Sequence, residues 1–218
     1  MSQGTWISHR GYCKDATENT RNSFDAAIKL GFTHLETDLR ATADGEIILQ
    51  HNSSIEHTCS QKHCVETSSW KELMPIKTHD EQNLLTLTEL YTDYHDYHWT
   101  LDIKRPDDQR TLDLLVLWVR KHKAETWIEQ HTRFLLWSPT SEAYARQLFP
   151  KVLTLAQERE CIQAGLSVLC RIPRLGGFQK GRTYSVPPQF AGMNLYTKRT
   201  LASYHAQGAR VLAYLPDR

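Results

Sequence analysis

The sequence predicts a single α/β domain made of parallel β-α-β units, arranged either as a (β/α) barrel or as an open, doubly wound sheet. Short apolar runs with strand character alternate with helical patterns of about ten residues, which is typical of parallel sheets. The chain has 218 residues, which is enough for one sizeable core and too few for two comfortable domains. The crossovers between strands are expected to be right-handed.

The individual elements follow from hydrophobic periodicity and from turn residues. The clearest helix is predicted at 111–123, where Leu112, Leu115, Val116 and Val119 share one face. The other helices are predicted at 23–31, 69–73, 86–94, 141–148, 158–164 and 198–207. Strands are predicted at 6–8, 33–39, 47–50, 98–103, 134–137, 152–155, 168–172, 190–195 and 209–215. The segment 53–83 reads as polar and irregular, and 173–189 reads as a basic loop rich in Gly and Pro.

Composition and charge argue against several classes of protein. Lys and Arg number 26 and Asp and Glu number 25, so no basic excess points to nucleic acid. The N-terminus lacks the pattern of a signal peptide, and no apolar run approaches the ~20 residues that span a bilayer. A cytoplasmic protein is therefore expected. His57, Cys59, His63 and Cys64 offer zinc-binding side chains, but their spacing is cramped and favours free thiols in a loop.

Polar residues gather at the ends of successive predicted strands. They are His9 and Arg10 after the first strand, Glu36 and Asp38 on the second, His51 after the hairpin strand, and Asp102 and Lys104 at the end of 98–103. Side chains two apart on a strand point to the same face, and the chemistry of a (β/α) barrel lies at the C-terminal ends of its strands. We therefore expect these seven side chains to converge on one mouth.

The residue types in this group suit the cleavage of a phosphoester. Three carboxylates together with substrate oxygens suit Mg²⁺ or Ca²⁺ rather than zinc. Two imidazoles suit proton transfer in both directions, and the cations Arg10 and Lys104 suit a phosphate. Each residue alone also has a purely structural explanation: His9 as a hydrogen-bonded buried histidine, and Asp102 with Lys104 as an ion pair.

Six short motifs within residues 5–104 carry a family resemblance. They are His9-Arg10-Gly11, Glu18-Asn19-Thr20 followed by Ser23-Phe24, Glu36-x-Asp38, Thr42-x-Asp44-Gly45, His51, and Leu101-Asp102-Ile103-Lys104. Their order and spacing resemble those of the glycerophosphodiester phosphodiesterase family. The resemblance implies a (β/α)₈ TIM-type barrel over residues 1–218, with a small insertion after the second strand at about 53–83.

The resemblance also implies an activity and a set of roles. The implied reaction is hydrolysis of a small glycerophosphodiester to glycerol 3-phosphate and an alcohol. The implied roles are a divalent cation held by Glu36, Asp38 and Asp102, His9 and His51 as the general base and acid, and Arg10 and Lys104 as the phosphate ligands. Glu18 and Asn19 are expected to hold the first loop by hydrogen bonds rather than to touch the substrate.

Three departures from the family pattern leave alternatives open. Asn52 follows His51 where the family usually has Asp, and as a strand neighbour its side chain is expected to face away from the imidazole. Asp102 is shorter than the usual Glu, which would draw the ion toward its strand. The chain stops soon after 211–215, so the barrel is expected to lack its closing strand, unless 168–172 replaces it.

Two other functions compete with the leading one. The first is a catalytically impaired relative that binds phosphodiesters or a partner protein. The second is a lysophospholipase-D-like phosphodiesterase that meets a lipid headgroup through the basic, aromatic segment 171–184. The leaving alcohol, the choice between Mg²⁺ and Ca²⁺ and the oligomeric state are left open by the sequence.

Overall fold

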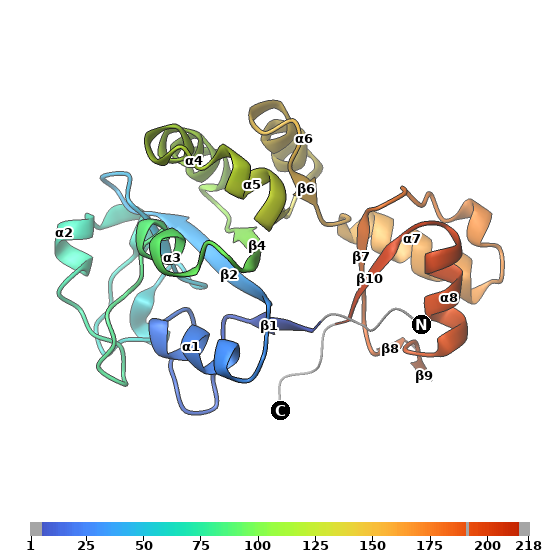
Figure 1. The fold of residues 1–218 in the computed structure, drawn as a ribbon, viewed down its shortest axis with the longest axis horizontal. Coiled ribbons are helices and arrows are strands. Elements are labelled where there is room, and N and C mark those ends of the chain that lie inside the picture. The colour runs from blue at the N-terminus through green and yellow to red at the C-terminus, as the bar shows by residue number, and fades with distance from the viewer. Residues whose placement is uncertain (1–5, 191, 214–218) are drawn as a thin grey trace. The chain divides into compact units, whose positions relative to one another are not determined.

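The structure, a computed structural model, describes residues 6–190 and 192–213 (Figure 1). The chain divides into two compact units. The first consists of Met1–Leu135 and Thr140–Val152, and the second of Leu136–Pro139 and Leu153–Arg218. The assignment of one domain over 1–218 and the closure of the barrel stay predictions.

Parallel strands form the sheet of the first unit. Their order is β1 (Ile7–His9), β2 (His34–Ala41), β4 (His98–Ile103) and β5 (Thr132–Leu135), and β3 (Ile47–Leu49) pairs with β2 in the antiparallel sense. The register sets His9 beside Glu36 and Asp38 beside Asp102. The predicted convergence of strand ends is thus built into the pairing of three neighbouring strands.

The helices of the first unit lie largely within the ranges predicted for them, with ends that differ by a few residues. They are α1 (Arg21–Lys29), α2 (Trp70–Leu73), α3 (Leu87–Tyr94), α4 (Asp108–His122), α5 (Glu125–His131) and α6 (Pro139–Leu148). In α6, the first residue, Pro139, is assigned to the second unit. Thr20 and Ser23 form a reciprocal capping box at the start of α1. Helix α5 had no predicted counterpart, because its seven residues are too few to show a clear periodicity.

The segment 53–83 is ordered around a small hydrophobic core that it shares with β3. It contains two short 3₁₀ helices, Ile55–His57 and Val65–Thr67, and α2. Its buried cluster is Ile48, Ile55, Cys59, Val65, Leu73, Ile76 and Leu84, with Trp70 packed against it. Asp80 accepts hydrogen bonds from the backbone N and the Oγ1 of Thr17 at 3.1 and 2.6 Å, which ties the insertion to the loop after β1.

The second unit contains short strands and two longer helices. They are β6 (Leu153–Thr154), α7 (Glu158–Leu169), a 3₁₀ helix (Pro173–Leu175), β7 (Thr183–Val186), β8 (Gln189–Phe190), β9 (Met193–Asn194), α8 (Lys198–Ala206) and β10 (Arg210–Ala213). Strand β10 pairs with β7 in parallel, and β8 pairs with β9 as a hairpin. The last two residues of the predicted strand 209–215 lie outside the described residues.

Three predictions for the second unit are wrong. The single strand expected at 190–195 is instead the pair of short antiparallel strands β8 and β9. The strand at 168–172 does not form, because α7 continues through Gly165 and places Cys161, Ala164 and Val168 against the core at helical spacing. Strand β7 forms inside the segment predicted as a loop, where Thr, Tyr and Val favour extended backbone. Its Tyr184 is fully buried against Phe178 and Tyr204. The segment 168–172 therefore supplies no closing strand.

No helix of the described ranges combines the length and the apolar character needed to cross a membrane.

Three imidazole rings stack where strands of the first unit begin. His34 and His98 open β2 and β4, and His131 ends α5 just before β5. The ring centroids are 4.6 Å apart for His34 and His98 and 5.1 Å apart for His98 and His131. Burial, followed by the nearby charges of His98 and Arg133, lowers the pKa of His34 from 6.5 to about 4. The pKa of His98 is also lowered, first by burial.

This stack predicts a loss of stability in mild acid. The unfolded chain protonates His34 near pH 6.5 but the folded protein only near pH 4. Between these values the unfolded state holds more protons, so a falling pH favours unfolding. The urea midpoint is expected to drop between about pH 7 and pH 5, and to drop less in His34→Gln. His57→Gln, which changes an exposed histidine, should keep the wild-type slope. An unchanged slope in His34→Gln would contradict this origin.

Candidate active site

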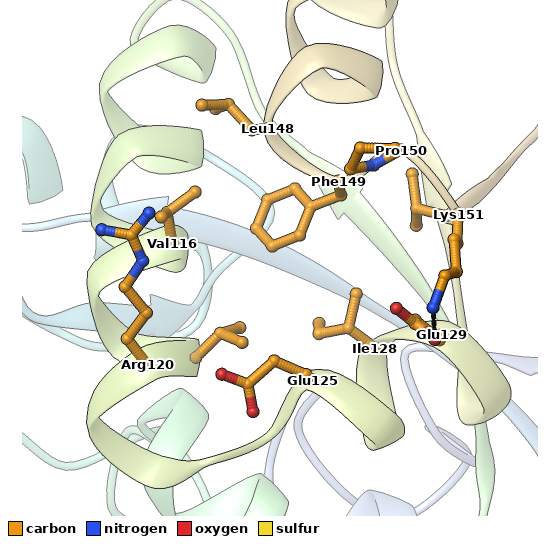
Figure 2. A pocket seen from close by; sticks show the side chains of 11 residues that line it. Val116, Arg120, Glu125, Ile128, Glu129, Leu148, Phe149, Pro150 and Lys151 are labelled. Carbon is orange, nitrogen blue, oxygen red and sulfur yellow. Dashed lines mark hydrogen bonds and ion pairs between the residues drawn. The ribbon is translucent and has the colours of Figure 1, made fainter.

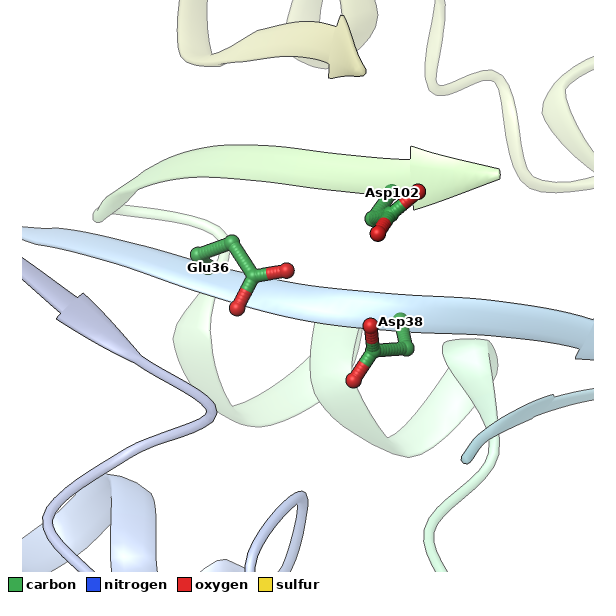
Figure 3. Close-up of side chains that lie close together, drawn as sticks. All are labelled: Glu36, Asp38 and Asp102. Atoms are coloured by element: carbon green, nitrogen blue, oxygen red, sulfur yellow. The ribbon is translucent and has the colours of Figure 1, made fainter. Parts of the chain in front are cut away.

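Three buried carboxylates meet on neighbouring strands of the first unit. Figure 3 shows Glu36 and Asp38 on β2 and Asp102 on β4. Their exposed fractions are 6%, 0% and 3%, and one oxygen from each lies within 4.8 Å of the others. Because metal–oxygen bonds are about 2.0–2.6 Å long, oxygens at this separation can share one ion. Among the described residues, no other three His, Cys, Asp or Glu side chains form such a group.

The strand register explains why the three acids meet. Glu36 and Asp38 are two apart on β2 and so point to one face, and Asp102 is the β4 residue directly beside Asp38. The alternative zinc cluster around Cys59 and Cys64 gains no support, because within 6–190 and 192–213 only the acids gather in this way. All five cysteines are free.

The electrostatics of the acid cluster favour an additional positive charge. Burial, followed by the neighbouring Asp38 and Asp102, raises the pKa of Glu36 well above its usual value, against the opposing charge of Arg10. Asp38 Oδ1 is buried and accepts no hydrogen bond of good geometry, although Lys104 Nζ lies 3.1 Å away. An all-oxygen donor set with an unsatisfied oxygen fits a hard divalent cation such as Mg²⁺ or Ca²⁺.

Both predicted phosphate ligands contact the acid cluster. Lys104 Nζ donates to Asp102 Oδ2 at 2.8 Å, and Arg10 Nε lies 3.2 Å from Asp38 Oδ2. The guanidinium of Arg10 also donates from Nη1 to Glu18 at 2.9 Å. Two cations therefore lie against three carboxylates, so the cluster itself keeps an excess of negative charge when all three acids are ionised.

The turn after β1 requires the glycine of the first motif. Arg10 and Gly11 both have positive φ, at 56° and 88°. A Cβ on Gly11 would lie 2.6 Å from the backbone carbon of Ser23, a separation that side chains do not adopt. This close approach aims the backbone N–H of Arg10 at Glu36 Oε2, to which it donates at 3.1 Å.

Glu18 and Asn19 hold the first loop by hydrogen bonds, as predicted. Glu18 accepts from Arg10, and Asn19 donates from Nδ2 to Asp38 Oδ2 at 2.8 Å. Thr37 Oγ1 in turn donates to Asn19 Oδ1 at 2.8 Å, which fixes the orientation of the amide. Asn19 thus orients a candidate metal ligand, which its place in the sequence motif alone did not reveal.

The two predicted histidines approach the cluster in different ways. His9 is partly exposed, and its Nε2 lies 3.8 Å from Glu36 Oε2. His51 follows β3, and its neighbour Gln50 donates a backbone hydrogen bond to the carbonyl oxygen of Asp38 at 3.0 Å. His9 therefore approaches the acids with its side chain. The position of His51 relative to them is set by the main-chain hydrogen bond of its neighbour Gln50.

The expected orientation of Asn52 is wrong. Its Oδ1 lies 2.9 Å from Nδ1 of His51, so the amide contacts the imidazole instead of facing away. The reason is that β3 ends at Leu49 and the chain bends at 51–53, where the alternation of strand side chains no longer applies. With the proton on Nδ1, this contact leaves Nε2 of His51 for other chemistry.

Arg40 is a buried residue that the sequence analysis overlooked. It stands two residues after Asp38 on β2, and so on the same face as Glu36 and Asp38. That spacing could have identified it. Its guanidinium donates two hydrogen bonds to the carbonyl oxygen of His51.

A separate hollow of about 160 Å³ lies between α4, α5 and the end of α6 (Figure 2). Its walls include Val116, Ile128 and Phe149, and its rim carries Arg120 and the ion pair of Lys151 with Glu129. Charges of both signs surround an apolar floor, and no residue of the acid cluster lines it. It therefore does not match an anionic phosphodiester.

Comparisons with known proteins identify the family of the chain. The model of the glycerophosphoryl diester phosphodiesterase family matches residues 9–218. A probable glycerophosphodiester phosphodiesterase 2 of Mycobacterium tuberculosis is 25% identical over 224 residues, covering 97% of this chain and 79% of the relative. Glycerophosphodiester phosphodiesterase 1 of Bos taurus is 44% identical over 52 residues, or 24% of this chain and 16% of the relative.

Solved structures of similar fold cover nearly the whole chain. A glycerophosphodiester phosphodiesterase of Agrobacterium tumefaciens matches with a TM-score of 0.74 at 16% identity, over 99% of this chain and 87% of the other. A phosphodiesterase of Oleispira antarctica, solved with the product sn-glycerol-3-phosphate, matches with a TM-score of 0.72 at 18% identity, over 99% and 85%. These likenesses confirm the predicted (β/α) barrel fold class over the open, doubly wound sheet.

Proposed function

The chain belongs to the glycerophosphoryl diester phosphodiesterase family, which makes it a phosphoric diester hydrolase, and from this premise we propose its substrate and mechanism. The substrate is a small glycerophosphodiester, and the products are glycerol 3-phosphate and an alcohol. The product bound in the Oleispira antarctica phosphodiesterase supports this choice. The single observation that carries the proposal is the buried group of Glu36, Asp38 and Asp102 with His9, Arg10 and Lys104 against it.

Glu36, Asp38 and Asp102 would hold one divalent cation. The ion would supply positive charge beside the phosphate and the attacking hydroxyl. The unsatisfied Asp38 Oδ1 and the raised pKa of Glu36 support this assignment, because both are relieved by a cation. Mg²⁺ and Ca²⁺ fit the oxygen donors equally well.

Arg10 and Lys104 bind the phosphate of the substrate. A carboxylate already holds each of them against the cluster. Binding of the substrate therefore costs little side-chain conformational entropy at these two residues. Arg10 offers several N–H donors in one plane, and Lys104 offers a compact charge. Together they neutralise the charge that develops on the phosphoryl oxygens during the reaction.

His9 and His51 exchange protons with the reacting oxygens. One imidazole removes the proton from the attacking glycerol hydroxyl as its oxygen bonds to phosphorus, and water then opens the cyclic ester so formed to give glycerol 3-phosphate. The other donates a proton to the alcohol oxygen as its bond to phosphorus breaks. We assign the acid role to His51, whose Nδ1 faces Asn52 and whose Nε2 is then the proton-transferring atom.

The release of glycerol 3-phosphate from glycerophosphocholine tests the proposal. We expect turnover when Mg²⁺ or Ca²⁺ is added. Turnover should vanish in excess chelator and return when the ion is restored in excess of the chelator. Turnover that survives complete metal removal would exclude the three-carboxylate ion site.

Two further assays separate the competing functions. A catalytically impaired relative would show no turnover in the presence of metal, yet would gain thermal stability from glycerophosphocholine. Choline release from lysophosphatidylcholine tests the lysophospholipase-D-like alternative. That alternative is weakened by the burial of Tyr184 and Arg182 in the segment that was expected to meet the headgroup. Arg182 also pairs with Glu160 at 2.6 Å.

A further inference from the structure

Arg40 joins three segments of the first unit through a single buried guanidinium. Only 7% of the residue is exposed. Nε and Nη2 donate to the carbonyl oxygen of His51 at 3.0 and 2.8 Å. Nη1 donates to the carbonyl oxygen of Arg105 at 2.9 Å and to the carboxylate of Glu66. The three partners come from the bend after β3, from the segment after β4 and from the insertion.

Two of these segments carry residues of the proposed site. His51 is itself the proposed acid. Its carbonyl oxygen accepts two hydrogen bonds from one planar group, which fixes both the position and the orientation of the peptide plane. Arg105 directly follows Lys104, whose Nζ contacts Asp38 and Asp102. A shift of the guanidinium would therefore act chiefly on the main chain of His51, which accepts two of its hydrogen bonds. Lys104 is held separately by its own contacts with Asp38 and Asp102.

Glu66 is the counterion that keeps Arg40 in place. Burial alone would raise the pKa of Glu66, but hydrogen bonds from Ser53 and Cys64 and the charge of Arg40 lower it below its usual value. Cys64 Sγ donates to Glu66 Oε2 at 3.2 Å, and Ser53 Oγ donates to the same oxygen. The carboxylate is thus charged, buried and anchored within the insertion.

Stability alone does not explain a buried ion pair of this kind. Apolar residues of similar volume are often equally or more stabilising, because each buried charge must give up its hydration. A planar group with fixed donors is instead suited to holding several carbonyl oxygens in a set geometry. All of the donors of Arg40 that point to the His51 and Arg105 carbonyls are within 3.0 Å of their acceptors.

We propose that Arg40, held by Glu66, is a positioning residue for His51. It keeps the main chain of His51 where the imidazole can deliver a proton to the leaving alcohol, and it touches neither the substrate nor the metal. The proposal rests on the proton-donating role of His51 given above. It assigns to the insertion a part in the chemistry, since Glu66 belongs to that segment.

The test is a double-mutant cycle between this ion pair and His51. Arg40→Met combined with Glu66→Gln removes both charges, so that no buried charge is left unpaired. On glycerophosphocholine, the kcat of this variant is expected to fall by about 10- to 100-fold, with KM within about twofold, because a misplaced acid slows only the chemical step. In the His51→Ala background, the same two changes should cost less than about twofold more, since there is then no imidazole to place.

A leaving group that needs no proton gives a second readout. With p-nitrophenol as the leaving alcohol, both His51→Ala and the Arg40/Glu66 variant should lose far less turnover than with glycerophosphocholine, because p-nitrophenolate departs unprotonated. Lys62→Met combined with Glu56→Gln is the matched control. It removes an exposed ion pair of the same insertion, with a charge separation of 3.9 Å, and should leave both activities unchanged.

Arg40→Lys keeps the test decisive if the double variant does not fold. A lysine retains the charge beside Glu66 but cannot place paired donors on the His51 carbonyl. An intermediate loss of kcat, again absent in the His51→Ala background, is expected. A wild-type kcat in Arg40→Lys would overturn the positioning role, as would losses that multiply with that of His51→Ala.

The outcomes also distinguish this inference from the proposed function. If His51→Ala retains full turnover, the acid role of His51 fails and the role of Arg40 fails with it. If His51→Ala loses turnover while the Arg40/Glu66 variant retains it, the acid role stands and only the positioning role is overturned.

Discussion

Replacing His51 by Ala is expected to lower kcat on glycerophosphocholine by about 10²- to 10⁴-fold, the contribution of a positioned general acid. The fold should be retained, because the imidazole makes a side-chain contact to Asn52, while the main-chain bonds at the bend come from Arg40 and Gln50. Initial rates and a thermal unfolding curve measure the two properties.

The identity of the leaving alcohol shows which proton His51 transfers. If His51 is the acid, p-nitrophenol as the leaving alcohol should restore most of the lost rate in His51→Ala. His9→Ala should stay slow on the same substrate, because an attacking hydroxyl still needs a base. His57→Ala, at an exposed site in the insertion, is the control and should behave as wild type. An equal loss on both substrates in His51→Ala would reverse the assignment of acid and base.

Replacing Asp38 by Asn is expected to abolish both metal binding and most turnover. The amide keeps the size of the side chain and can still accept a hydrogen bond from Asn19, but it supplies no charge to an ion. The loss of kcat should be on the order of 10²-fold or more, since the charge of a bound ion contributes several kcal/mol to the transition state.

Thermal stability gives a measure of metal binding that does not depend on activity. An ion present at 100 times its Kd stabilises the wild-type protein by about 2.7 kcal/mol and so raises its Tm. Asp38→Asn should show no such rise at the same Mg²⁺ or Ca²⁺ concentration. Asp96→Asn changes an acid with an 89% exposed side chain and should respond as wild type does. A normal metal-induced rise in Asp38→Asn would show that the ion binds elsewhere.

The carboxylates of the site were predictable because strand geometry is regular. Residues two apart share a face, and the C-terminal ends of parallel strands lie together, so Glu36, Asp38 and Asp102 could be expected to converge once a parallel sheet was predicted. The same rule would have found Arg40, which was passed over because two of its three partners are backbone carbonyls. Every residue has a backbone carbonyl, so the sequence does not show which of them accepts a hydrogen bond from a side chain.

Other features depended on tertiary context that local patterns do not contain. Asn52 turns toward His51 because β3 is short and the chain bends at once. Helix α7 passes through Gly165 because the core on one side supports it. The Asp80–Thr17 contact joins residues 63 positions apart. The cytoplasmic location and the roles of the individual site residues stay predictions.

The anchoring of the insertion limits how this enzyme can be re-engineered. Two carboxylates of the segment, Glu66 and Asp80, hold Arg40 and the loop that carries Glu18 and Asn19. A chimera that replaces 53–83 with a shorter linker, or with the corresponding segment of a homologue, must reproduce both attachment points. The segment is therefore more readily altered at side chains on its outer surface than by exchanging it whole.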